Sequence, residues 1–368
     1  MREAIASLFL YLLKIYHMKL INYLLITLVF VSSCKEESDP EPSLSKDYGD
    51  GMYIVTDNGI SFYDGEVVKN QIYKKVNGSS ILNGKKIKFK GTKAYIVSDN
   101  QLVTANIETF ENKEIIDGFV NAVDFDFVSY DRLFVVDKDD AKVKEVDLVS
   151  LDITSDIETG DVASPSFIIS NSYRSIVLNS GLVADSLKDS TMIVIDNKDV
   201  LIPLVNFMGN LEVGDNPNSA VWIGTLKILC KGIYDENNLL SNTFSSLSKV
   251  DAGNVELDWN VTLPNIYNAK NLVSNSSNNK YFFTAADGVY QMNNDGSDIF
   301  QKIYFISDVL DLNIERYDLT DTTWANVNML YINDAVNNPN IIYKYNLFID
   351  TFCDTIVVDA PVNDIAFY

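Results

Sequence analysis

The stretch Met52-Tyr-Ile-Val-Thr-Asp57 decides the fold, because close copies of it recur along the rest of the chain. Each copy is a short run of bulky apolar residues, and most copies end at Asp or Asn. Such a run is typical of a buried β-strand followed by a tight polar turn. The copies lie about 40 to 55 residues apart, a period that indicates a repeated supersecondary unit. Six further copies begin at Ala94, Leu133, Ser175, Lys227, Tyr281 and Leu330.

Each copy is preceded by another apolar strand, which for the first copy is supplied by the end of the chain, and each copy is followed by two more strands. The accompanying strands are predicted at residues 86–90, 122–126, 166–169, 220–223, 270–273, 312–315 and 364–368. Examples of the following strands are predicted at residues 59–63, 115–116, 142–146, 192–195, 257–261 and 355–358. The repeated unit therefore has four strands.

The order of the strands predicts a closed ring. The first unit begins directly at its second strand, Met52, and its missing first strand is supplied by residues 364–368. Pairing the two ends in this way abolishes the open edge of a β-propeller, whereas a linear solenoid needs capping repeats at both ends. We therefore predict an all-β protein with a seven-bladed β-propeller over residues 50–368, rather than one with six or eight blades.

The first 33 residues carry the pattern of an export signal. Met18 opens an apolar run that is too short for a comfortable membrane span and ends in Val31-Ser32-Ser33-Cys34. This ending resembles a bacterial lipobox, in which the cysteine is diacylated; a transmembrane helix is the alternative. We expect residues 1–33 to be an upstream extension and signal peptide, Cys34 to be lipidated, and residues 34–49 to form a flexible acidic tether.

The composition disfavours several classes of function. The net charge is −22, and residues 34–368 carry 26 basic and 50 acidic side chains, a balance of −24. Such a surface repels phosphate backbones and anionic headgroups, so we expect no nucleic-acid partner and a covalent membrane anchor. The single histidine, His17, lies in the predicted signal segment, so the exported protein has no histidine for a Ser-His-Asp triad or a metal site. The protein is therefore expected not to be an enzyme.

From about residue 50 onward the architecture resembles the seven-bladed propellers of bacterial surface lipoproteins, which are related to surface-layer, YVTN-type and WD40-type propellers. One branch of that group captures cobalamin beside an outer-membrane, TonB-dependent transporter. Cys34-Lys35-Glu36-Glu37 also resembles the signal that sends some lipoproteins to the outer face of the outer membrane. The resemblance implies a surface-exposed outer-membrane protein. It rests on no ligand motif and assigns no binding residue.

Long loops on one face of the predicted propeller are the expected place for a binding site. The loops between second and third strands share this face with the loops between successive blades. The longer ones are predicted at residues 181–189, 209–218, 234–241 and 334–340. Tyr234 and Tyr267 lie in or beside such loops and are predicted to stack on a planar ligand or a sugar ring, with packing between blades as the alternative. For Phe119 and Trp222, core packing is the better interpretation.

Acidic residues recur where second strands end, at Asp57, Asp99, Asp137, Asp287 and Asp334. Such a rim offers oxygen ligands to Ca²⁺, whereas the alternative is that each side chain caps its own turn. No metal site is assigned, and no other cofactor is expected. The predicted ligand-binding residues are Tyr234, Tyr267, Asp137, Asn179 and Asp334.

Cys230 and Cys353 are predicted on strands of the fifth and seventh blades. Because these blades are not neighbours, we expect buried free thiols and no disulfide.

The leading functional hypothesis is a binding protein that captures a small molecule or glycan on the loop face and hands it to an outer-membrane transporter. A cobalamin-type ligand is one specific version. One alternative is a carboxylate-dependent glycoside hydrolase or lyase, because carboxylates alone can cleave glycosidic bonds. The other alternative is a protein-interaction scaffold of the cell envelope.

Overall fold

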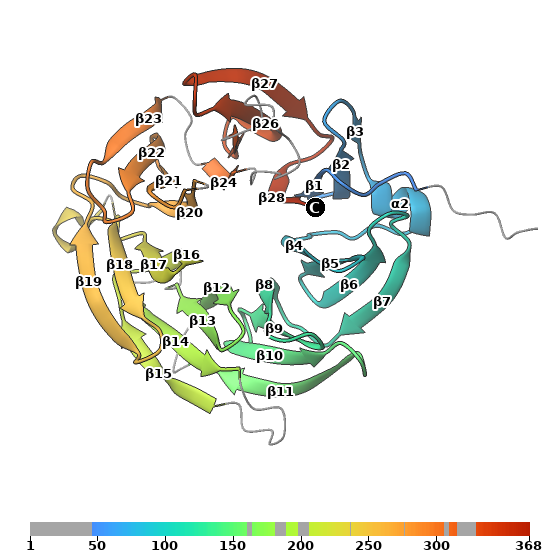
Figure 1. The fold of residues 1–368 in the computed structure, drawn as a ribbon, viewed down its shortest axis with the longest axis horizontal. Coiled ribbons are helices and arrows are strands. Elements are labelled where there is room, and N and C mark those ends of the chain that lie inside the picture. The colour runs from blue at the N-terminus through green and yellow to red at the C-terminus, as the bar shows by residue number, and fades with distance from the viewer. Residues whose placement is uncertain are drawn as a thin grey trace, which may run out of the picture. The chain divides into compact units, whose positions relative to one another are not determined.

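The structure, a computed structural model, describes residues 46–159, 164–180, 189–197, 206–235, 237–275, 277–304, 309–314 and 329–368. Seven four-stranded sheets stand around a common centre (Figure 1). The predicted seven-bladed β-propeller is therefore confirmed. No helix in the described ranges is long and apolar enough to cross a membrane. The predicted signal peptide and Cys34 lie outside these ranges.

The blades are numbered in chain order, and their strands run from the centre outward. Blade 1 consists of β28 (Val362–Phe367), β1 (Met52–Thr56), β2 (Gly59–Tyr63) and β3 (Val68–Lys69), followed by the helix α2 (Ile72–Asn77). Blade 2 consists of β4 (Lys86–Lys90), β5 (Lys93–Ser98), β6 (Gln101–Asn106) and β7 (Asn112–Asp117). Blade 3 consists of β8 (Ala122–Phe127), β9 (Arg132–Asp137), β10 (Lys142–Asp147) and β11 (Asp152–Glu158).

The remaining four blades repeat the same order. Blade 4 consists of β12 (Pro165–Ser170), β13 (Arg174–Asn179), β14 (Thr191–Asp196) and β15 (Asn206–Glu212). Blade 5 consists of β16 (Pro217–Ile223), β17 (Thr225–Cys230), β18 (Ser246–Asp251) and β19 (Glu256–Thr262), with a short 3-10 helix (Leu239–Ser241) between β17 and β18. Blade 6 consists of β20 (Lys270–Ser274), β21 (Lys280–Ala285), β22 (Gly288–Asn293) and β23 (Phe300–Tyr304). Blade 7 consists of β24 (Val309–Ile314), β25 (Met329–Asp334), β26 (Asn338–Asn346) and β27 (Thr351–Val357).

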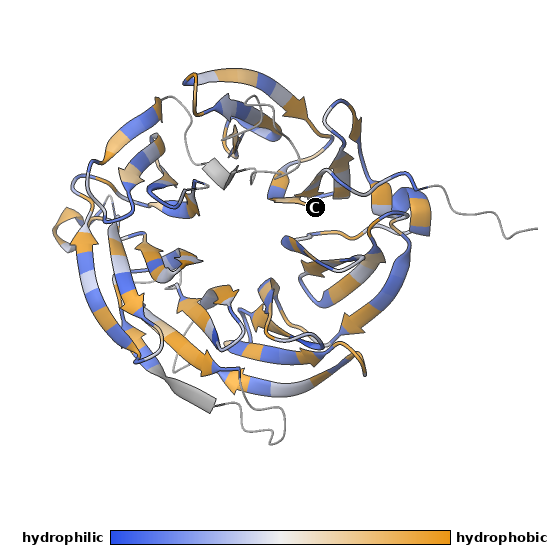
Figure 2. Cartoon of the chain, in the orientation of Figure 1, coloured by the Kyte–Doolittle hydropathy of each residue, from blue (hydrophilic) through white to orange (hydrophobic). Residues whose placement is uncertain are grey.

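The strands differ in burial according to their place in the blade. Every residue of β1, β2 and β25 is buried, because these strands are covered by a neighbouring blade on each side. The outer strands β11 and β19 bury only part of their side chains, and hydrophilic and hydrophobic residues mix along the outer strands in Figure 2. The core therefore consists of apolar clusters between adjacent blades, such as the one that packs Tyr95 of blade 2 against Phe125 and Leu133 of blade 3.

The C-terminal strand completes blade 1. β28 pairs antiparallel with β1, which places Asp364 opposite Val55, and the two strands lie side by side in Figure 1. The Asp364 carboxylate accepts hydrogen bonds from the Ile87 backbone N–H (3.0 Å) and from Lys86 Nζ (2.6 Å). The predicted closure is therefore confirmed, and one buried carboxylate links the closing strand to blade 2.

Equivalent bridges link other innermost strands. The Asp124 carboxylate accepts a hydrogen bond from the Ile168 N–H (3.0 Å), and the Ser219 hydroxyl oxygen accepts one from the Leu272 N–H (3.1 Å). The innermost strands of adjacent blades do not form a common sheet, so these buried N–H groups need side-chain acceptors.

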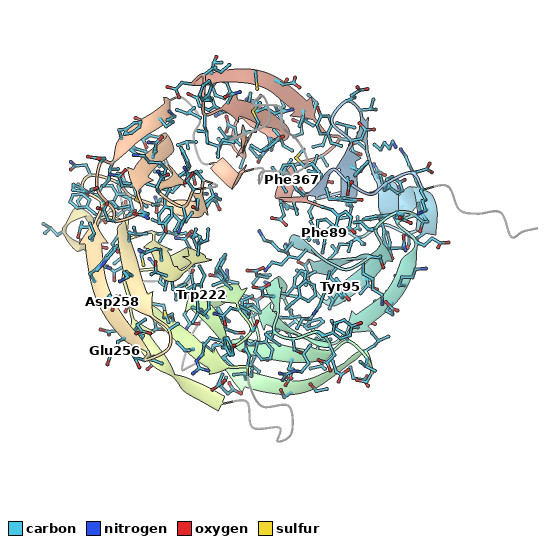
Figure 3. All side chains as sticks on the ribbon, viewed as in Figure 1. Phe89, Tyr95, Trp222, Glu256, Asp258 and Phe367 are labelled. Atoms are coloured by element: carbon cyan, nitrogen blue, oxygen red, sulfur yellow. The ribbon has the colours of Figure 1, made fainter. Side chains whose placement is uncertain are left out.

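Aromatic side chains accompany these bridges near the centre. Phe89, Trp222 and Phe367 lie on innermost strands, whereas Glu256 and Asp258 of β19 lie at the outer rim (Figure 3). The acidic residues at the rim help to make the outer surface hydrophilic, in agreement with the net charge of the chain.

Blade 1 departs from the predicted pattern on its outer side. β3 has only two residues, and the helix α2 follows it. Ile72 and Tyr73 are buried, and the Tyr73 ring packs edge-on against Phe110 of blade 2 (centroids 6.4 Å apart). The helix ends at Gly78, which adopts a left-handed conformation (φ 76°). Two apolar residues followed by lysines are too short a pattern to distinguish a helical turn from a strand.

Two of the four predicted long loops are mostly regular structure. Residues 209–218 include the end of β15 and the start of β16, and residues 334–340 include the end of β25 and the start of β26. Polar residues within strands caused both errors. Residues 181–188 of a third predicted loop lie outside the described ranges.

The last residues of the predicted tether contact the propeller. The Tyr48 ring packs edge-on against Phe62 and Phe110 (centroids 5.6 and 5.8 Å apart), and Lys46 Nζ lies 2.9 Å from a carboxylate oxygen of Glu108. Residues 46–49 therefore belong to the folded unit that continues to residue 368.

Both described cysteines are free, but only Cys230 is buried. Cys353 is exposed because β27 is the outer strand of blade 7. The prediction of two buried thiols was therefore wrong for Cys353.

Candidate functional site

Three aromatic side chains meet on the loop face of blade 5, the face that carries the connections between second and third strands. The rings of Tyr234 and Tyr267 lie 5.2 Å apart between centroids, and Phe244 lies 5.0 Å from Tyr267. Tyr234 and Phe244 are 46% and 36% exposed, so their rings remain accessible to a ligand. We call these three residues the aromatic trio. The structure thus brings together the two tyrosines that the sequence singled out.

Two loops position the trio. Tyr234 and Phe244 come from the connection between β17 and β18, and Tyr267 comes from the connection between β19 and β20. The sequence did not indicate Phe244, although it lies only three residues beyond the predicted loop 234–241. An aromatic residue just before a buried strand has the sequence pattern of a core residue. Its position on the loop face becomes clear only from its contact with Tyr267 in the connection between β19 and β20.

Hydrogen bonds tie together the base of the connection between β17 and β18. Ile233 and Thr243 exchange backbone hydrogen bonds of 3.0 Å, and the Thr243 hydroxyl donates to the Asp215 carboxylate (2.7 Å). Gly232 is required at the base of this hairpin. It has a φ of 72°, and a Cβ at this position would lie 2.6 Å from the Phe244 carbonyl carbon and would overlap the Thr243 carbonyl oxygen. The backbone hydrogen bonds join Ile233 and Thr243, the residues directly before Tyr234 and Phe244.

Replacement of Gly232 by alanine is expected to distort this hairpin and to lower the free energy of unfolding by about 1–3 kcal/mol, because strain and steric overlap add together. Gly224 provides a matched control. It has nearly the same φ, 71°, on the opposite face of blade 5, and a Cβ added there would have no atom within 4 Å. Denaturant unfolding of both variants checks the prediction. Equal losses of stability in G232A and G224A would show that the hairpin does not need glycine for close approach.

A cavity of about 370 Å³ lies beside the trio, between blades 4 and 5. We call it cavity A. Phe244 lines one side of it, the carboxylates of Glu212 and Asp215 line it as well, and Asn260 and Ser246 contribute an amide and a hydroxyl group. Its volume falls within the usual range of ligand sites.

A larger cavity of about 630 Å³ lies between blades 5 and 6. We call it cavity B. The blade connection that carries Tyr267 contributes Asn265 and Ile266, whereas blade 6 contributes Tyr290, Phe300 and Gln301. The trio is therefore adjacent to both cavities, since Phe244 lines cavity A and Ile266, the residue before Tyr267, lines cavity B.

The chemistry of the two cavities is similar. Hydroxyl, amide, carboxylate and aromatic side chains line both, and neither lining includes lysine or arginine. Such walls favour a neutral ligand that is rich in hydroxyl groups and disfavour phosphates and carboxylates. Cys230 lies beneath cavity A, and burial raises the pKa of its thiol to about 12. A thiol with so high a pKa is a poor nucleophile at neutral pH.

The other three predicted ligand residues are engaged in the fold. Asp137 is fully buried and lies 2.9 Å from Lys144 Nζ. Asp334, 3% exposed, caps its own turn by accepting the Val336 N–H (3.2 Å). These side chains lie in blades 3 and 7, away from the trio in blade 5.

Asn179 in blade 4 is also fully buried. Its amide donates to Thr191 Oγ1 (3.0 Å) and to the Thr159 carbonyl oxygen (3.2 Å). Its Oδ1 has no hydrogen-bond partner among the described residues. Ligand binding by Asp137, Asn179 and Asp334 stays a prediction, and the contacts seen here give each of them a structural role.

Other acidic residues of the predicted rim form ion pairs and hydrogen bonds with neighbouring segments. Asp99 forms an ion pair with Lys85 (3.1 Å), and Asp57 accepts a hydrogen bond from the Asn363 amide (3.0 Å). Within the described part of the chain, no group of three or more His, Cys, Asp or Glu side chains is placed to hold a metal ion.

Phe119 and Trp222 pack in the core. Phe119 is 5% exposed and lies in the cluster between blades 2 and 3, and Trp222 packs, partly buried, against the cluster between blades 4 and 5. Core packing was the better interpretation for both.

Fold and site together define the class: the protein is a seven-bladed β-propeller with exposed aromatic residues and two cavities next to the loop-face connections of blade 5. No protein-family profile matches the chain, and no curated protein is similar to it in sequence. Solved structures do share its fold. A putative 6-phosphogluconolactonase from Bacteroides uniformis aligns with a TM-score of 0.64 at 11% identity, over 86% of this chain and 99% of that one.

Further similar structures have names that describe different activities. A quinonprotein alcohol dehydrogenase-like protein from Bacteroides thetaiotaomicron aligns with a TM-score of 0.63 at 15% identity, over 86% of this chain and 78% of its own. Hydrazine synthase from Kuenenia stuttgartiensis aligns with a TM-score of 0.60 at 12% identity, over 80% of this chain and 90% of that chain. At such low identities these similarities establish the fold alone.

Proposed function

We propose that the protein is a lipid-anchored binding protein on the cell surface that captures a neutral, hydroxyl-rich small molecule or glycan at the aromatic trio. The observation that carries this proposal is the meeting of Tyr234, Phe244 and Tyr267 beside polar cavities without lysine or arginine. Aromatic rings cover the apolar faces of sugar rings, while hydroxyl, amide and carboxylate groups bond to the sugar hydroxyls.

The lipid anchor belongs to the proposal through Cys34 and the lipobox-like residues before it. An anchored propeller can concentrate a ligand at the outer membrane and pass it to a TonB-dependent transporter. A cobalamin-type ligand is the specific version that the resemblance to surface lipoproteins implies. The polar walls without basic side chains favour a neutral glycan over cobalamin, which carries a phosphate.

A second candidate function has one observation in its favour. Glu212 and Asp215 both line cavity A. Most glycoside hydrolases use a pair of carboxylic acid side chains for catalysis. Release of reducing ends from a bound glycan would identify this activity. Replacement of either residue by its amide would then abolish turnover while binding remained.

The proposed function is tested by a thermal-shift screen of the purified propeller against neutral oligosaccharides, cobalamins, haem and Ca²⁺. A ligand at about one hundred times its Kd adds roughly 2.7 kcal/mol to the stability of the folded state, which raises the Tm clearly. We expect neutral oligosaccharides to raise the Tm. If none of these compounds shifts it, the capture hypothesis fails.

The Tyr267→Ala variant is expected to weaken binding of the identified ligand about 30-fold, because removal of a central aromatic anchor costs roughly 2 kcal/mol. Isothermal titration calorimetry measures this change. Phe348→Ala is the matched control, since Phe348 is 75% exposed on blade 7, far along the chain from the trio. Unchanged affinity in Tyr267→Ala would remove the trio from the site.

A further inference from the structure

Cavities A and B flank the aromatic trio and are connected through one short segment. Thr262, at the end of β19, lines both cavities. Phe244 belongs to the wall of cavity A, and Ile266, the residue before Tyr267, belongs to the wall of cavity B. The Phe244 and Tyr267 rings lie 5.0 Å apart, so an aromatic pair connects a wall residue of cavity A with the residue that follows a wall residue of cavity B.

The wall of cavity B is not made by the loop-face connection alone. Its lining begins at residues 262–266 and reaches the turn at residues 296–299, which joins β22 to β23 on the opposite face. At that turn blades 5 and 6 come into contact, since a Cβ at Gly296 would lie 3.4 Å from Val261. The cavity is thus a groove at the boundary between two blades.

The groove repeats the chemistry of the trio at a second place. Phe300 is 46% exposed and lines cavity B, so it presents a second aromatic surface along the groove. Asp298, Ser297 and Gln301 provide polar groups beside it. Aromatic surfaces separated by polar groups suit a ligand made of repeated units, whereas a single compact molecule would occupy only one of the cavities.

We infer that the ligand is a linear neutral oligosaccharide that spans cavity A, the aromatic trio and cavity B. This inference rests on the proposed function and adds the length and the course of the ligand. One part of the chain occupies cavity A beside Asp215 and Asn260, a middle unit stacks on Tyr267, and the rest lies along cavity B against Phe300.

The experiment measures affinity against chain length. The intact exported protein is titrated calorimetrically with cello-, xylo-, manno- and malto-oligosaccharides, each from the monosaccharide to the octasaccharide. For the series that binds, we expect the Kd to fall by about 100-fold from the disaccharide to the longest member, and then to level off when both cavities are filled.

Two variants separate the parts of the groove. Phe300→Ala is expected to weaken the longest oligosaccharide about 10-fold and to leave the disaccharide unchanged, whereas Tyr267→Ala weakens both. Phe348→Ala is the control for loss of an exposed aromatic ring. Because Phe300 is 46% exposed and Phe348 is 75% exposed, neither variant is expected to change the Tm of the unbound protein by more than a few degrees.

The outcomes distinguish the two proposals. Binding that is lost in Tyr267→Ala but does not depend on chain length leaves the proposed function intact and overturns the extended ligand. Equal effects of Phe300→Ala on the disaccharide and on the octasaccharide also overturn it. If no oligosaccharide binds at any length, the extended ligand is overturned, and the proposed function fails with it if the thermal-shift screen also finds no ligand.

Discussion

Removal of residues 362–368 is expected to leave the chain without a cooperatively folded state. This deletion takes away β28, the innermost strand of blade 1, and with it the buried side chains of Val362 and Ile365. Burial of two such side chains contributes about 3–6 kcal/mol, and the backbone ladder with β1 adds to this. The total is comparable with the whole stability of an ordinary domain, about 5–15 kcal/mol.

The deletion also opens the ring. Without β28, β1 becomes the innermost strand of blade 1 with an unpaired edge, and an exposed edge strand promotes aggregation. Circular dichroism during thermal unfolding, together with size-exclusion chromatography, checks the prediction. A sharp monomeric transition near the Tm of the intact protein would show that closure is dispensable.

A point variant tests the same closure with a smaller expected loss of stability. Asp364→Ala is expected to cost about 2–4 kcal/mol, because the buried Ile87 N–H loses its acceptor and Lys86 loses its ion pair with this carboxylate. Asp364→Asn retains one acceptor oxygen, so its stability should lie between that of Asp364→Ala and that of the intact protein. The control is Asp354→Ala on the exposed β27, expected to change stability by less than about 0.5 kcal/mol.

Much of the fold could be predicted because each blade repeats one local signal. A run such as Leu133-Phe-Val-Val-Asp137 combines strand-forming residues with a turn residue, and seven copies fix the number of blades. Closure was predictable because residues 364–368 fit the one position that lacked a strand. The helix α2 was missed because its burial depends on Phe110, which comes from another blade.

The candidate site was predictable only in part. Tyr234 and Tyr267 are 33 residues apart in sequence, yet the topology of a propeller places their two loops on one face. The cavities were not predictable, because their walls combine side chains of adjacent blades whose contacts no local pattern encodes. The role of an acidic residue at the end of a strand also could not be predicted from the local sequence. Its use in a turn, in an ion pair or in binding depends on neighbours such as Lys144.

Asp137→Ala is the point variant with the largest expected loss of stability, about 3–5 kcal/mol. Asp137 is fully buried, accepts the backbone N–H groups of Val120 (2.8 Å) and Asn121 (2.7 Å), and lies 2.9 Å from Lys144 Nζ. The substitution leaves two N–H groups without an acceptor. Asp140, 3.0 Å from Lys144 Nζ, prevents the ammonium group from being wholly unpaired. Asp139→Ala, an exposed position in the same turn, is the control.

The pH dependence separates the charge of Asp137 from its hydrogen bonds. Burial lowers the pKa of Lys144, but its bonds to Asp137 and Asp140 outweigh burial and raise the pKa above the usual value of 10.5. Because the folded state holds this proton more tightly than the unfolded state, the ion pair contributes fully below pH 10.5 and its contribution falls as the pH rises further.

The stability deficit of Asp137→Asn should therefore begin to shrink above pH 10.5, whereas a deficit caused only by lost N–H acceptors would stay constant. Urea unfolding from pH 8 to pH 11 measures the difference.

The same variant also distinguishes a structural role of Asp137 from a role in ligand binding. Because the Asp137 carboxylate has no exposed surface and already binds three donors, the affinity for an oligosaccharide at the aromatic trio should not change in Asp137→Asn. A lost affinity at full folding would instead move the binding site from blade 5 toward blade 3.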